Sequence, residues 1–334
     1  WPAGRLAVVG GGALNPALLL MLRERFPGLH TPRLAEAFEA YGAALWALEH
    51  QCAAMPGDPE KLFGPARRTF PSHPPLRAAL NLVEFKTMAR RAPEPGDACI
   101  LGLDVGSTTT KAVLIRAGDS GMVASVYLRT DGNPVGAARR CYAGLLERLA
   151  SAPIRILGLG VTGSGRQLAA LHAQTPNAIN EIVAHAAAAA HFDPAVDTIF
   201  EIGGQDAKYT HLVSGVPADY AMNEACSAGT GSFLEESARE SLNIPAEKIG
   251  DLALAGLSPP NFNDQCAAFI SSDVKRATQE GVGRDDLLAG LVYSVCLNYL
   301  NRVKGARPAG RRIFMQGGVC YNRAVPAAMA SLLR

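Results

Sequence analysis

Two stretches of this sequence share one order of residue types: an apolar run with an acidic residue near its end, a glycine turn, and a second run that includes a lysine. They are Leu101-Gly-Leu-Asp-Val-Gly-Ser-Thr-Thr-Thr-Lys111 and Thr198-Ile-Phe-Glu-Ile-Gly-Gly-Gln-Asp-Ala-Lys208. Each stretch predicts a buried strand, a tight turn and a second strand, which together form a β-hairpin with polar groups at its tip. One such hairpin in each half of a domain predicts two lobes with a nucleotide cleft between them.

The first hairpin has the groups needed to bind phosphate and magnesium. Asp104 stands at the end of the first strand, and Lys111 lies in the second. Between them the turn offers hydroxyl and backbone donors from Gly106, Ser107, Thr108 and Thr109. Such a turn can hold phosphate oxygens while the aspartate faces a hydrated Mg²⁺. It is not a Walker A loop, because a strand and not a helix follows the glycine. The alternative is a structural Gly-Ser-Thr hairpin with Asp104 as its capping residue.

The second hairpin predicts the rest of a catalytic centre. Gly203 and Gly204 permit close backbone approach, and Gln205 with Asp206 is expected to orient a water or a metal ion against a γ-phosphate. We therefore predict Asp104, Gln205 and Asp206 as catalytic residues, with Mg²⁺ at the two aspartates.

Two further glycine pairs extend this predicted site. Gly317 and Gly318 form a turn expected to contact an adenosine. Gly229, Thr230 and Gly231 begin a helix whose N-terminal amides suit an anion, although the same residues can serve helix capping alone.

The remaining pattern alternates between strands and helices, which indicates an α/β fold. Strands are expected near 99–104, 110–116, 122–129, 154–161, 197–202, 207–213 and 312–316. Helices are expected near 135–150, 178–192, 230–242, 265–280 and 284–303.

An internal repeat divides the chain. Residues 6–15 and 313–322 both read as a strand, a glycine turn and the start of a helix, with Gly10, Gly11 and Asn15 matching Gly317, Gly318 and Asn322 at an offset of 307. Residues 51–97 contain eight of the 22 prolines, which is linker composition with room for one helix over 76–91. The chain is therefore expected to hold the tail of one unit and most of a second.

Composition excludes several classes of partner. Lys and Arg number 32 against 30 Asp and Glu, and no basic run suggests binding to nucleic acid or to a lipid surface. The sequence contains no uninterrupted stretch of about eighteen apolar residues, so it does not predict a membrane span. The seven cysteines are an odd number, widely scattered, in a chain too large to need disulfides, which predicts a reducing cytoplasmic location.

Two cysteines stand apart from the others. Cys226 and Cys266 are expected at helix N-termini, where the helix dipole favours the thiolate that a metal cluster needs. Two cysteines do not complete a four-coordinate site, so a cluster would have to be shared about a two-fold axis; buried structural cysteines are the alternative. His185 and His191 are six residues apart and do not form a metal pair.

Seven short motifs follow one another between residues 98 and 334: Asp104-Val-Gly-Ser-Thr, Val161-Thr-Gly-Ser-Gly-Arg166, Asn180-Glu-Ile, Glu201-Ile-Gly-Gly-Gln-Asp206, 223–231 around Cys226, Cys266-x-x-Phe-x-Ser-Ser and Gly317-Gly318-Val. In order and spacing they resemble the 2-hydroxyacyl-CoA dehydratase activators, iron–sulfur ATPases of the acetate kinase, sugar kinase, heat-shock chaperone and actin superfamily. The similarity covers about 98–334. The stretch from Tyr293 to Arg302 resembles in particular the large activators, which carry two ATPase units.

The resemblance implies a two-lobed, actin-like ATPase (ribonuclease H-like) fold with mixed sheets that binds ATP or ADP with Mg²⁺. It also implies a homodimer with one 4Fe-4S cluster held by Cys226 and Cys266 of each subunit. ATP hydrolysis would drive one-electron transfer, from reduced ferredoxin or flavodoxin, to a dehydratase or aryl-CoA reductase acting on CoA esters. The competing hypotheses are a sugar or amino-sugar kinase on the same fold and a nucleotide-responsive interaction module without a cluster.

The expected organisation combines the repeat with this resemblance. Residues 1–52 would close a preceding ATPase unit, 53–97 would be a Pro-rich linker, 98–195 the first lobe, and 196–334 a second lobe with the cluster cysteines, truncated at its C-terminal end.

Overall fold

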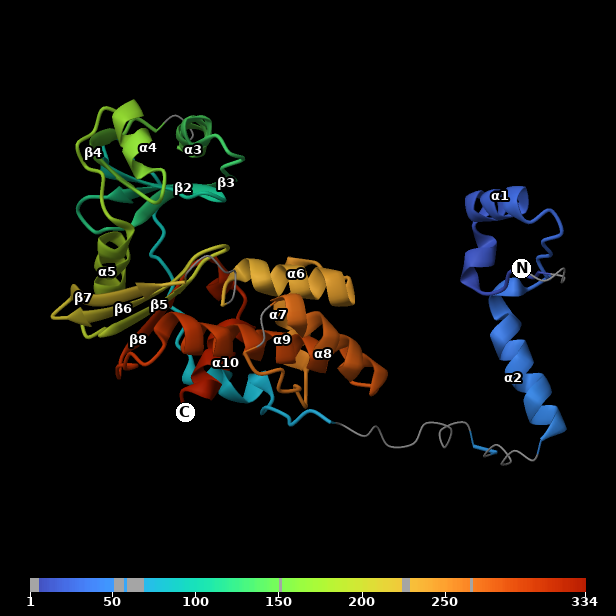
Figure 1. Cartoon of the computed structure of the whole chain (residues 1–334). Helices are drawn as coiled ribbons and strands as arrows, with labels where there is room; N and C mark the ends of the chain where they lie inside the picture. The colour runs from blue at the N-terminus through green and yellow to red at the C-terminus, as the bar shows by residue number, and fades with distance from the viewer. Residues whose placement is uncertain (1–5, 51–56, 59–68, 150–151, 224–228, 265–266) are drawn as a thin grey trace. The chain divides into compact units, whose positions relative to one another are not determined.

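The computed structural model describes residues 6–50, 57–58, 69–149, 152–223, 229–264 and 267–334 (Figure 1). The chain forms two compact units, Trp1–Pro65 and Ala66–Arg334, which we call the N-terminal unit and the C-terminal unit.

The N-terminal unit is built from short helices. Its elements are the 3₁₀ helices η1 (Gly11–Leu14) and η2 (Ala35–Ala37) and the α-helices α1 (Pro16–Arg25) and α2 (Phe38–Glu49). Ala7 and His30 form a single parallel bridge that ties the start of the unit to the segment before η2. The Asn15 side chain accepts hydrogen bonds from the amides of Ala17 and Leu18, at 3.0 and 3.2 Å, and so caps α1.

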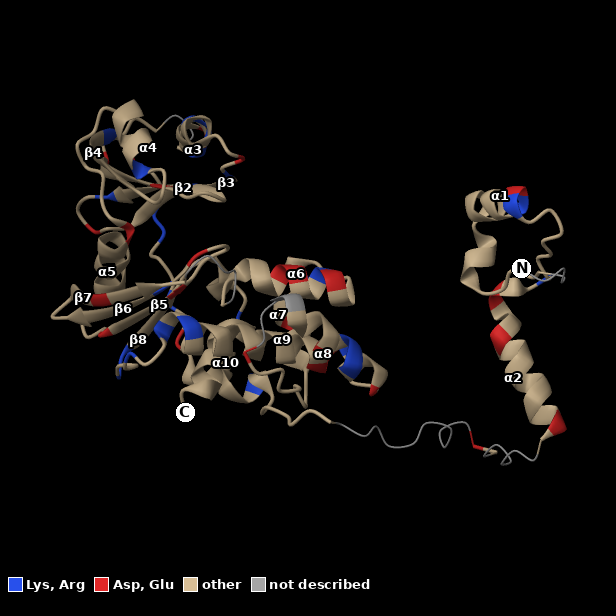
Figure 2. Ribbon diagram, viewed as in Figure 1, with Lys and Arg blue, Asp and Glu red and all other residues tan. Residues whose placement is uncertain are grey.

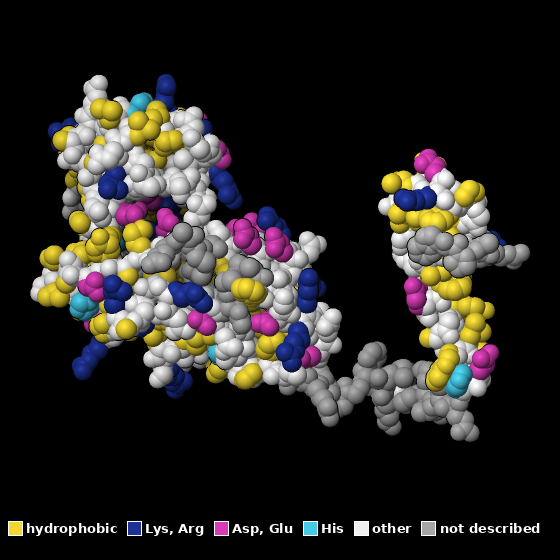
Figure 3. Space-filling model, in the orientation of Figure 1, with side chains coloured by type: hydrophobic (Ala, Val, Ile, Leu, Met, Phe, Trp, Pro, Cys, Tyr) yellow, Lys and Arg dark blue, Asp and Glu magenta, His cyan; other side chains and the backbone are white. Residues whose placement is uncertain are grey.

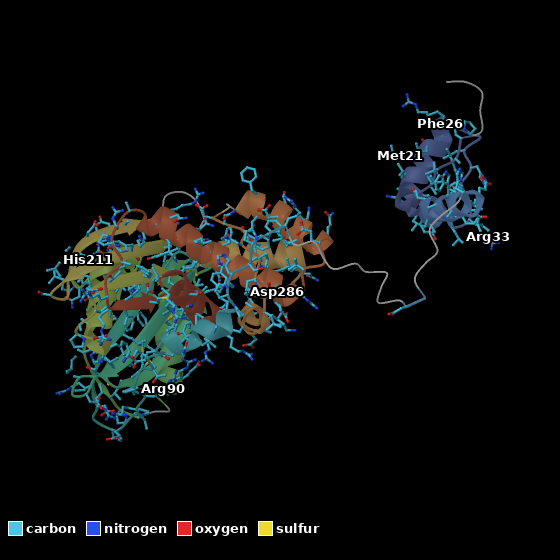
Figure 4. All side chains as sticks on the ribbon, turned by 90° about the horizontal axis from the view of Figure 1, so that it is seen from below. Met21, Phe26, Arg33, Arg90, His211 and Asp286 are labelled. Atoms are coloured by element: carbon cyan, nitrogen blue, oxygen red, sulfur yellow. The ribbon has the colours of Figure 1, made fainter. Side chains whose placement is uncertain are left out.

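Little of the N-terminal unit is buried. Among its described residues only Ala13 and Ala35 are buried, and α1 contains no buried residue. Met21 of α1, labelled in Figure 4, is 70% exposed. Apolar side chains line the surface of this unit in Figure 3, and the large ones include Leu14, Leu20, Leu34, Tyr41, Trp46 and Leu48. The described part of this unit therefore lacks a hydrophobic core of its own.

The C-terminal unit contains two four-stranded mixed sheets. The first has the strand order β3-β2-β1-β4. Its strands are β1 (Ala98–Val105), β2 (Thr109–Arg116), β3 (Met122–Arg129) and β4 (Arg155–Thr162). β1 to β3 form an antiparallel meander, and β4 returns parallel to β1 after helix α3 (Pro134–Arg148).

The second sheet repeats this topology in the order β7-β6-β5-β8. Its strands are β5 (Thr198–Ile202), β6 (Ala207–Val213), β7 (Val216–Met222) and β8 (Ile313–Gln316). Again three strands form an antiparallel meander and the fourth pairs parallel with the first. The repeated topology gives the C-terminal unit two lobes, and the prediction of a two-lobed α/β fold with mixed sheets is confirmed.

Helices cover both faces of the second sheet (Figure 1). On one face α5 packs over Ile199 and Leu212, and on the other a larger core contains Phe200, Ile202 and Tyr209. The remaining helices of the C-terminal unit are α4 (Arg166–His172), α5 (Glu181–Phe192), α6 (Gly231–Leu242), α7 (Ala246–Ala255), α8 (Ala267–Gln279), α9 (Arg284–Asn298) and α10 (Ala324–Leu332), with the π-helical η5 (Tyr299–Lys304) and the 3₁₀ helices η4 (Leu76–Leu82) and η6 (Gly318–Tyr321).

Part of the proline-rich stretch packs on the second lobe. Leu76 of η4 is fully buried in the larger core, and the His73 ring stacks on Tyr293 with centroids 4.1 Å apart. The His73 amide donates to the Pro259 carbonyl at 2.8 Å. The helix expected over 76–91 is therefore shorter, because a 3₁₀ helix ends at Leu82 and an extended chain follows it.

The other strands and helices expected between residues 99 and 316 are present with ends within a few residues of those expected. The strand expected at the start of residues 6–15 is wrong, because that segment pairs only through the single bridge between Ala7 and His30. The helix expected over 284–303 changes at Tyr299 from α9 to the π-helical η5. Among the α-helices and strands of the described residues, α4, α7 and β7 were not predicted. Within the described ranges, no helix is both long and apolar enough to cross a membrane.

Candidate nucleotide site

The first predicted hairpin places Asp104 opposite Lys111. The two residues pair across the antiparallel β1–β2 ladder, and the Lys111 Nζ lies 2.8 Å from Asp104 Oδ2. Their side chains are 36% and 39% exposed, so both charges remain accessible to a ligand. A carboxylate and an ammonium at one strand end are the groups that a magnesium ion and a phosphate prefer, so this pair is chemically suited to the predicted role.

Backbone and hydroxyl contacts fix the turn between them. The Gly106 amide donates to the Thr109 carbonyl at 3.0 Å, and the Thr130 amide donates to Thr108 at 2.9 Å. The Thr130 hydroxyl donates to the Gly106 carbonyl at 2.8 Å, so Thr110, 2.9 Å away, must donate to Thr130. The turn is thus held from the end of β3, and its geometry does not depend on a ligand.

Gly163 belongs to this site and was not among the predicted site residues. A Cβ at this position would lie 2.5 Å from both Asp104 Oδ1 and the Val105 carbonyl oxygen, and φ is +91°. Only glycine fits there. The sequence feature that pointed to Gly163 was the Val161-Thr-Gly-Ser-Gly-Arg166 motif. The backbone of this motif packs directly against Asp104, the predicted catalytic aspartate.

The second turn is closed by the Gly203 amide, which donates to the Asp206 carbonyl at 2.8 Å. The N-terminus of α6 clamps it: the amides of Gly231 and Ser232 donate to the carbonyls of Gly203 and Gly204, at 2.9 and 2.7 Å. The Ser232 hydroxyl also donates to Gly204, at 2.6 Å. These two amides are occupied by the turn. Anion binding at Gly229, Thr230 and Gly231 accordingly stays a prediction, and the contacts present there hold the turn.

The third turn, Gly317–Gly318, lies against the end of β5. A Cβ on Gly317 would meet the Ile202 carbonyl oxygen at 2.2 Å, and its φ is +97°. Val319 lies beside α6, because a Cβ on Gly231 would be 2.7 Å from its Cγ2. The second and third turns and the start of α6 therefore form one packed group.

Contacts across the two lobes bring these turns to the first hairpin. Ser107 Oγ lies 3.5 Å from Gln205 Oε1, which is a long hydrogen bond between the two predicted phosphate turns. Tyr127 of β3 lies close to the first and third turns. Lys111 Nζ is 5.8 Å from the centroid of the Tyr127 ring, and the Tyr127 hydroxyl would be 3.9 Å from a Cβ added to Gly318. Tyr127 was not predicted as a site residue. The structure thus brings together the three predicted turns, from 104–111, 203–206 and 317–318.

Gly229 serves a different contact. Its φ is +77°, and a Cβ would lie 2.9 Å from the Tyr299 amide nitrogen of the π-helical η5. Tyr299 in turn donates its hydroxyl to the Lys208 carbonyl at 2.7 Å. The start of the α6 segment, η5 and the second hairpin are therefore in direct contact, and Thr230 is buried among them.

A buried polar group beneath the second turn was also missed. Glu201, Lys208 and Gln316 stand side by side on neighbouring strands, below His185 and Glu181 of α5. Burial has the largest single effect on the pKa of His185 and lowers it, but the hydrogen bond and negative charge of Glu201, together with the hydrogen bond to Gln316, outweigh burial and raise that pKa above its ordinary value. Burial raises the pKa of Glu201, yet His185 and Lys208 together lower it. The group is therefore a charged network.

The predicted cluster ligands, Cys226 and Cys266, lie outside the described residues. Cys99, Cys141, Cys296 and Cys320 are described as free thiols. Burial raises the pKa of Cys141, and raises that of Cys320 to about 12, so these thiols remain protonated. In the described part of the chain no group of three or more His, Cys, Asp or Glu side chains is arranged to hold a metal ion.

Glu235 and Glu236 are exposed on α6, whose acidic bands appear in Figure 2.

Known proteins resemble this chain over most of its C-terminal unit. The (R)-2-hydroxyglutaryl-CoA dehydratase activating ATPase of Acidaminococcus fermentans is 31% identical over 235 residues, which cover 69% of this chain and 86% of that protein. A benzoyl-CoA reductase subunit from Thauera aromatica is 25% identical over 66% of this chain and 78% of its own length. The solved activator of the 2-hydroxyisocaproyl-CoA dehydratase from Clostridium difficile, with bound ADPNP, superimposes with a TM-score of 0.61 at 29% identity, covering 70% of this chain and 84% of that one.

These similarities confirm the actin-like ATPase fold expected from the sequence. The model of the BadF/BadG/BcrA/BcrD ATPase family matches residues 101–334, from the strand that carries Asp104 to the end of the chain. The chain therefore belongs to the BadF/BadG/BcrA/BcrD ATPase family.

Proposed function

We propose that this ATPase is an activator that couples ATP hydrolysis to one-electron transfer onto an enzyme acting on CoA esters. The observation that carries the nucleotide part is the meeting of the two acidic hairpins, at Ser107 and Gln205, beside the Gly317–Gly318 turn. Two acidic strand ends facing one another can hold a magnesium nucleotide between them.

Within this site each residue has a proposed role. Asp104 and Asp206 would hold Mg²⁺ through carboxylate oxygens, which are the ligands this ion prefers. Gln205 would orient the attacking water, and Lys111 would contact a phosphate oxygen. The phosphates would be surrounded by the turn residues Gly106, Ser107, Thr108, Thr109, Gly203 and Gly204, and the adenosine would contact Gly317 and Gly318. Gly229, Thr230 and Gly231 would support the phosphate site by holding the second turn, because Thr230 is buried and the Gly231 amide donates to the Gly203 carbonyl.

The electron-transfer part rests on Cys226 and Cys266. Two thiolates per chain would hold a 4Fe-4S cluster together with the same pair from a second subunit, in a homodimer. The described helices that follow these cysteines, α6 and α8, pack on one core through Phe233 and Ile270. When bound, the cluster would supply a low-potential electron, with reduced ferredoxin or flavodoxin as its source.

The proposed partner is an enzyme that reduces or dehydrates a CoA ester. Relatives are named as activators of 2-hydroxyglutaryl-CoA and 2-hydroxyisocaproyl-CoA dehydratases, and another is a benzoyl-CoA reductase subunit. All three names share the CoA thioester, so we propose that chemistry for the partner of this chain.

We also propose that residues 1–52 close a second ATPase unit of the same kind. Gly10 (φ 84°, ψ 176°) and Gly317 (φ 97°, ψ 163°) share one backbone conformation, and each precedes a four-residue 3₁₀ helix. Asn15 and Asn322 also share one backbone conformation, with φ of about −80° and ψ of about 100°. The side chain of each accepts a hydrogen bond from the backbone amide two residues later. That unit would precede the one whose lobes are residues 98–195 and 196–334. Residues 53–97, part of which packs on the lobe 196–334, would connect the two units.

Anaerobic purification tests the cluster. We expect a brown protein with about four irons per dimer, lost in Cys226→Ser and in Cys266→Ser. Cys141→Ala is the control, because this thiol lies in the core of the first lobe, where its Sγ is 3.7 Å from the Thr110 carbonyl oxygen. An iron-free dimer after reconstitution under reducing conditions would contradict the proposal and leave ATP-dependent phosphorylation of a small molecule as the activity to assay.

A further inference from the structure

The polar network beneath the second turn lies at the point where two strands of the sheet separate. β5 and β8 run parallel, and their last paired residues are Glu201 and Gln316. Gly203 follows Glu201 by two residues, and Gly317 follows Gln316 directly. Beyond this pair one strand enters the turn proposed for phosphate and the other enters the turn proposed for adenosine.

His185 joins the two strands at that point from the helix above. Its Nε2 lies 3.2 Å from Glu201 Oε1, and its Nδ1 contacts Gln316 Oε1. The Gln316 Nε2 donates back to the His185 carbonyl at 3.2 Å. Both ring nitrogens face oxygen acceptors, so an imidazolium that donates from each satisfies both contacts. One side chain thus connects the ends of both strands.

The rest of the network holds Glu201 in place. Lys208 Nζ lies 3.3 Å from Glu201 Oε2 and 3.6 Å from Glu181 Oε1. The Lys208 side chain is 3% exposed and that of Glu201 is 12% exposed. Charges so buried are costly unless they are paired, and here each has an opposite partner. The carboxylate therefore has one stable position, set from β6 on one side and from α5 on the other.

We propose that His185 is a positioning residue that fixes the separation of the Gly203–Gly204 and Gly317–Gly318 turns. A ligand that occupies both turns then finds them already at the right distance and does not have to order them on binding. A ligand that occupies only the phosphate turn gains nothing from this link. This inference rests on the proposed placement of phosphate and adenosine at the two turns.

The test compares two ligands on the full chain by titration calorimetry with Mg²⁺: ATP, which needs both turns, and tripolyphosphate, which needs only the phosphate turn. His185→Ala should weaken ATP binding about tenfold, the effect of losing a charge-assisted hydrogen bond, and should change tripolyphosphate binding less than about twofold. His191→Ala is the matched control. It is the same substitution on the same helix, at an exposed residue whose ring contacts only Phe192.

A second variant removes the same link from β8. Gln316→Met keeps the size of the side chain but not its acceptor, and it should reproduce the selective loss of ATP affinity. Because both substitutions break one link, the double variant should lose no more than either single variant, whereas independent structural damage would add. Gln316→Met also serves as the test if His185→Ala does not fold.

Each outcome is informative. Equal weakening of both ligands, additive losses, or a loss in His191→Ala equal to that in His185→Ala would overturn the positioning role. A wild-type chain that binds tripolyphosphate and ATP with the same affinity would instead contradict the proposed adenosine turn. A wild-type chain that binds neither would contradict the nucleotide site itself.

Discussion

At the scale of single residues, close backbone approach explains several glycines of the candidate site. The adjacent pair Gly317 and Gly318 gives a direct test. A methyl group on Gly317 would meet the Ile202 carbonyl oxygen at 2.2 Å in a backbone with φ +97°, whereas on Gly318 its nearest neighbour is the Tyr127 hydroxyl at 3.9 Å. Gly317→Ala should therefore destabilise the protein by about 2–4 kcal/mol, the sum of backbone strain and overpacking. Gly318→Ala should cost less than about 1 kcal/mol.

Denaturant unfolding without nucleotide measures both variants. Equal stabilities for Gly317→Ala and Gly318→Ala would contradict the close packing of the third turn on β5.

Asp104 is the residue on which the proposed chemistry most depends. Asp104→Ala should lower the rate of ATP hydrolysis by about a hundredfold or more, because magnesium and its charge stabilisation would be lost. Stability should change little, since the Asp104–Lys111 pair is more than a third exposed. Asp219→Ala is the control, because it breaks an ion pair of similar length, 2.9 Å to Arg307, at similar exposure. Hydrolysis that persists in Asp104→Ala would contradict the role of the first hairpin.

The His185–Glu201 pair predicts a dependence of stability on pH. The pKa of His185 is raised by Glu201 against burial, so its contribution is complete below the ordinary value of 6.5 and is lost as pH rises through the raised value. The pKa of Glu201 is lowered, despite burial, by His185 and Lys208, so its contribution is complete above 4.5 and is lost as pH falls. Between these limits the pair stabilises the fold most. Lys208 and Glu181 are the other charged groups that face the pair.

The measurement is the difference in unfolding free energy between wild type and His185→Gln. It should be larger near about pH 5.5 than near about pH 8.5. A difference independent of pH would mean that folding leaves the pKa of His185 unchanged, and a difference larger at about pH 8.5 would mean that the folded imidazole is neutral; either result would contradict the prediction.

At the scale of elements, α6 acts through its first turn, which clamps the second hairpin. Ser232→Ala removes the hydroxyl that donates to Gly204 at 2.6 Å, and should cost about 1 kcal/mol and raise the KM for ATP. Ser237→Ala is the matched control on the same helix. The Ser237 hydroxyl is buried without a hydrogen-bond partner in the described structure, so its removal should be neutral or stabilising. Chemical denaturation and steady-state ATPase kinetics report the two effects. If the two serine variants behaved alike, the clamp would have no energetic role.

The elements also show what the sequence could predict. Both hairpins were predictable because their polar residues follow apolar runs and their turns begin at glycine. β7 was not, because Pro217 lies within it and most of its residues are exposed at the sheet edge. The row formed by Lys208, Glu201 and Gln316 was equally inaccessible. It depends on β8 pairing in one register with a strand more than a hundred residues earlier, and local patterns carry no information about such pairing.

At the scale of the whole molecule, one strand order occurs twice. The orders β3-β2-β1-β4 and β7-β6-β5-β8 have the same directions, and each first hairpin carries an acidic residue to the edge from which its turn emerges. The candidate site therefore combines equivalent hairpins from two lobes of the same topology, and the Gly317–Gly318 turn adds an asymmetric third part. In the N-terminal unit, Gly10 to Arg25 has the same order of glycine turn, 3₁₀ helix and α-helix as that third part.

The two segments differ in what covers them, and this difference predicts how the N-terminal unit behaves alone. In α10 the six residues from Ala324 to Met329 are all buried, whereas α1 buries none. Burial of apolar surface is the main stabilising contribution to folding, and the described part of this unit buries only two alanines.

A fragment of residues 1–65 should therefore unfold without a cooperative transition, bind a hydrophobic dye and be cleaved rapidly by protease. Residues 66–334, which contain three clusters of buried hydrophobic side chains, should unfold cooperatively. Calorimetry and limited proteolysis of the two fragments compare them directly. A sharp transition in the 1–65 fragment, with little dye binding, would mean that this unit is complete in itself, and would contradict the proposal that it closes another ATPase unit.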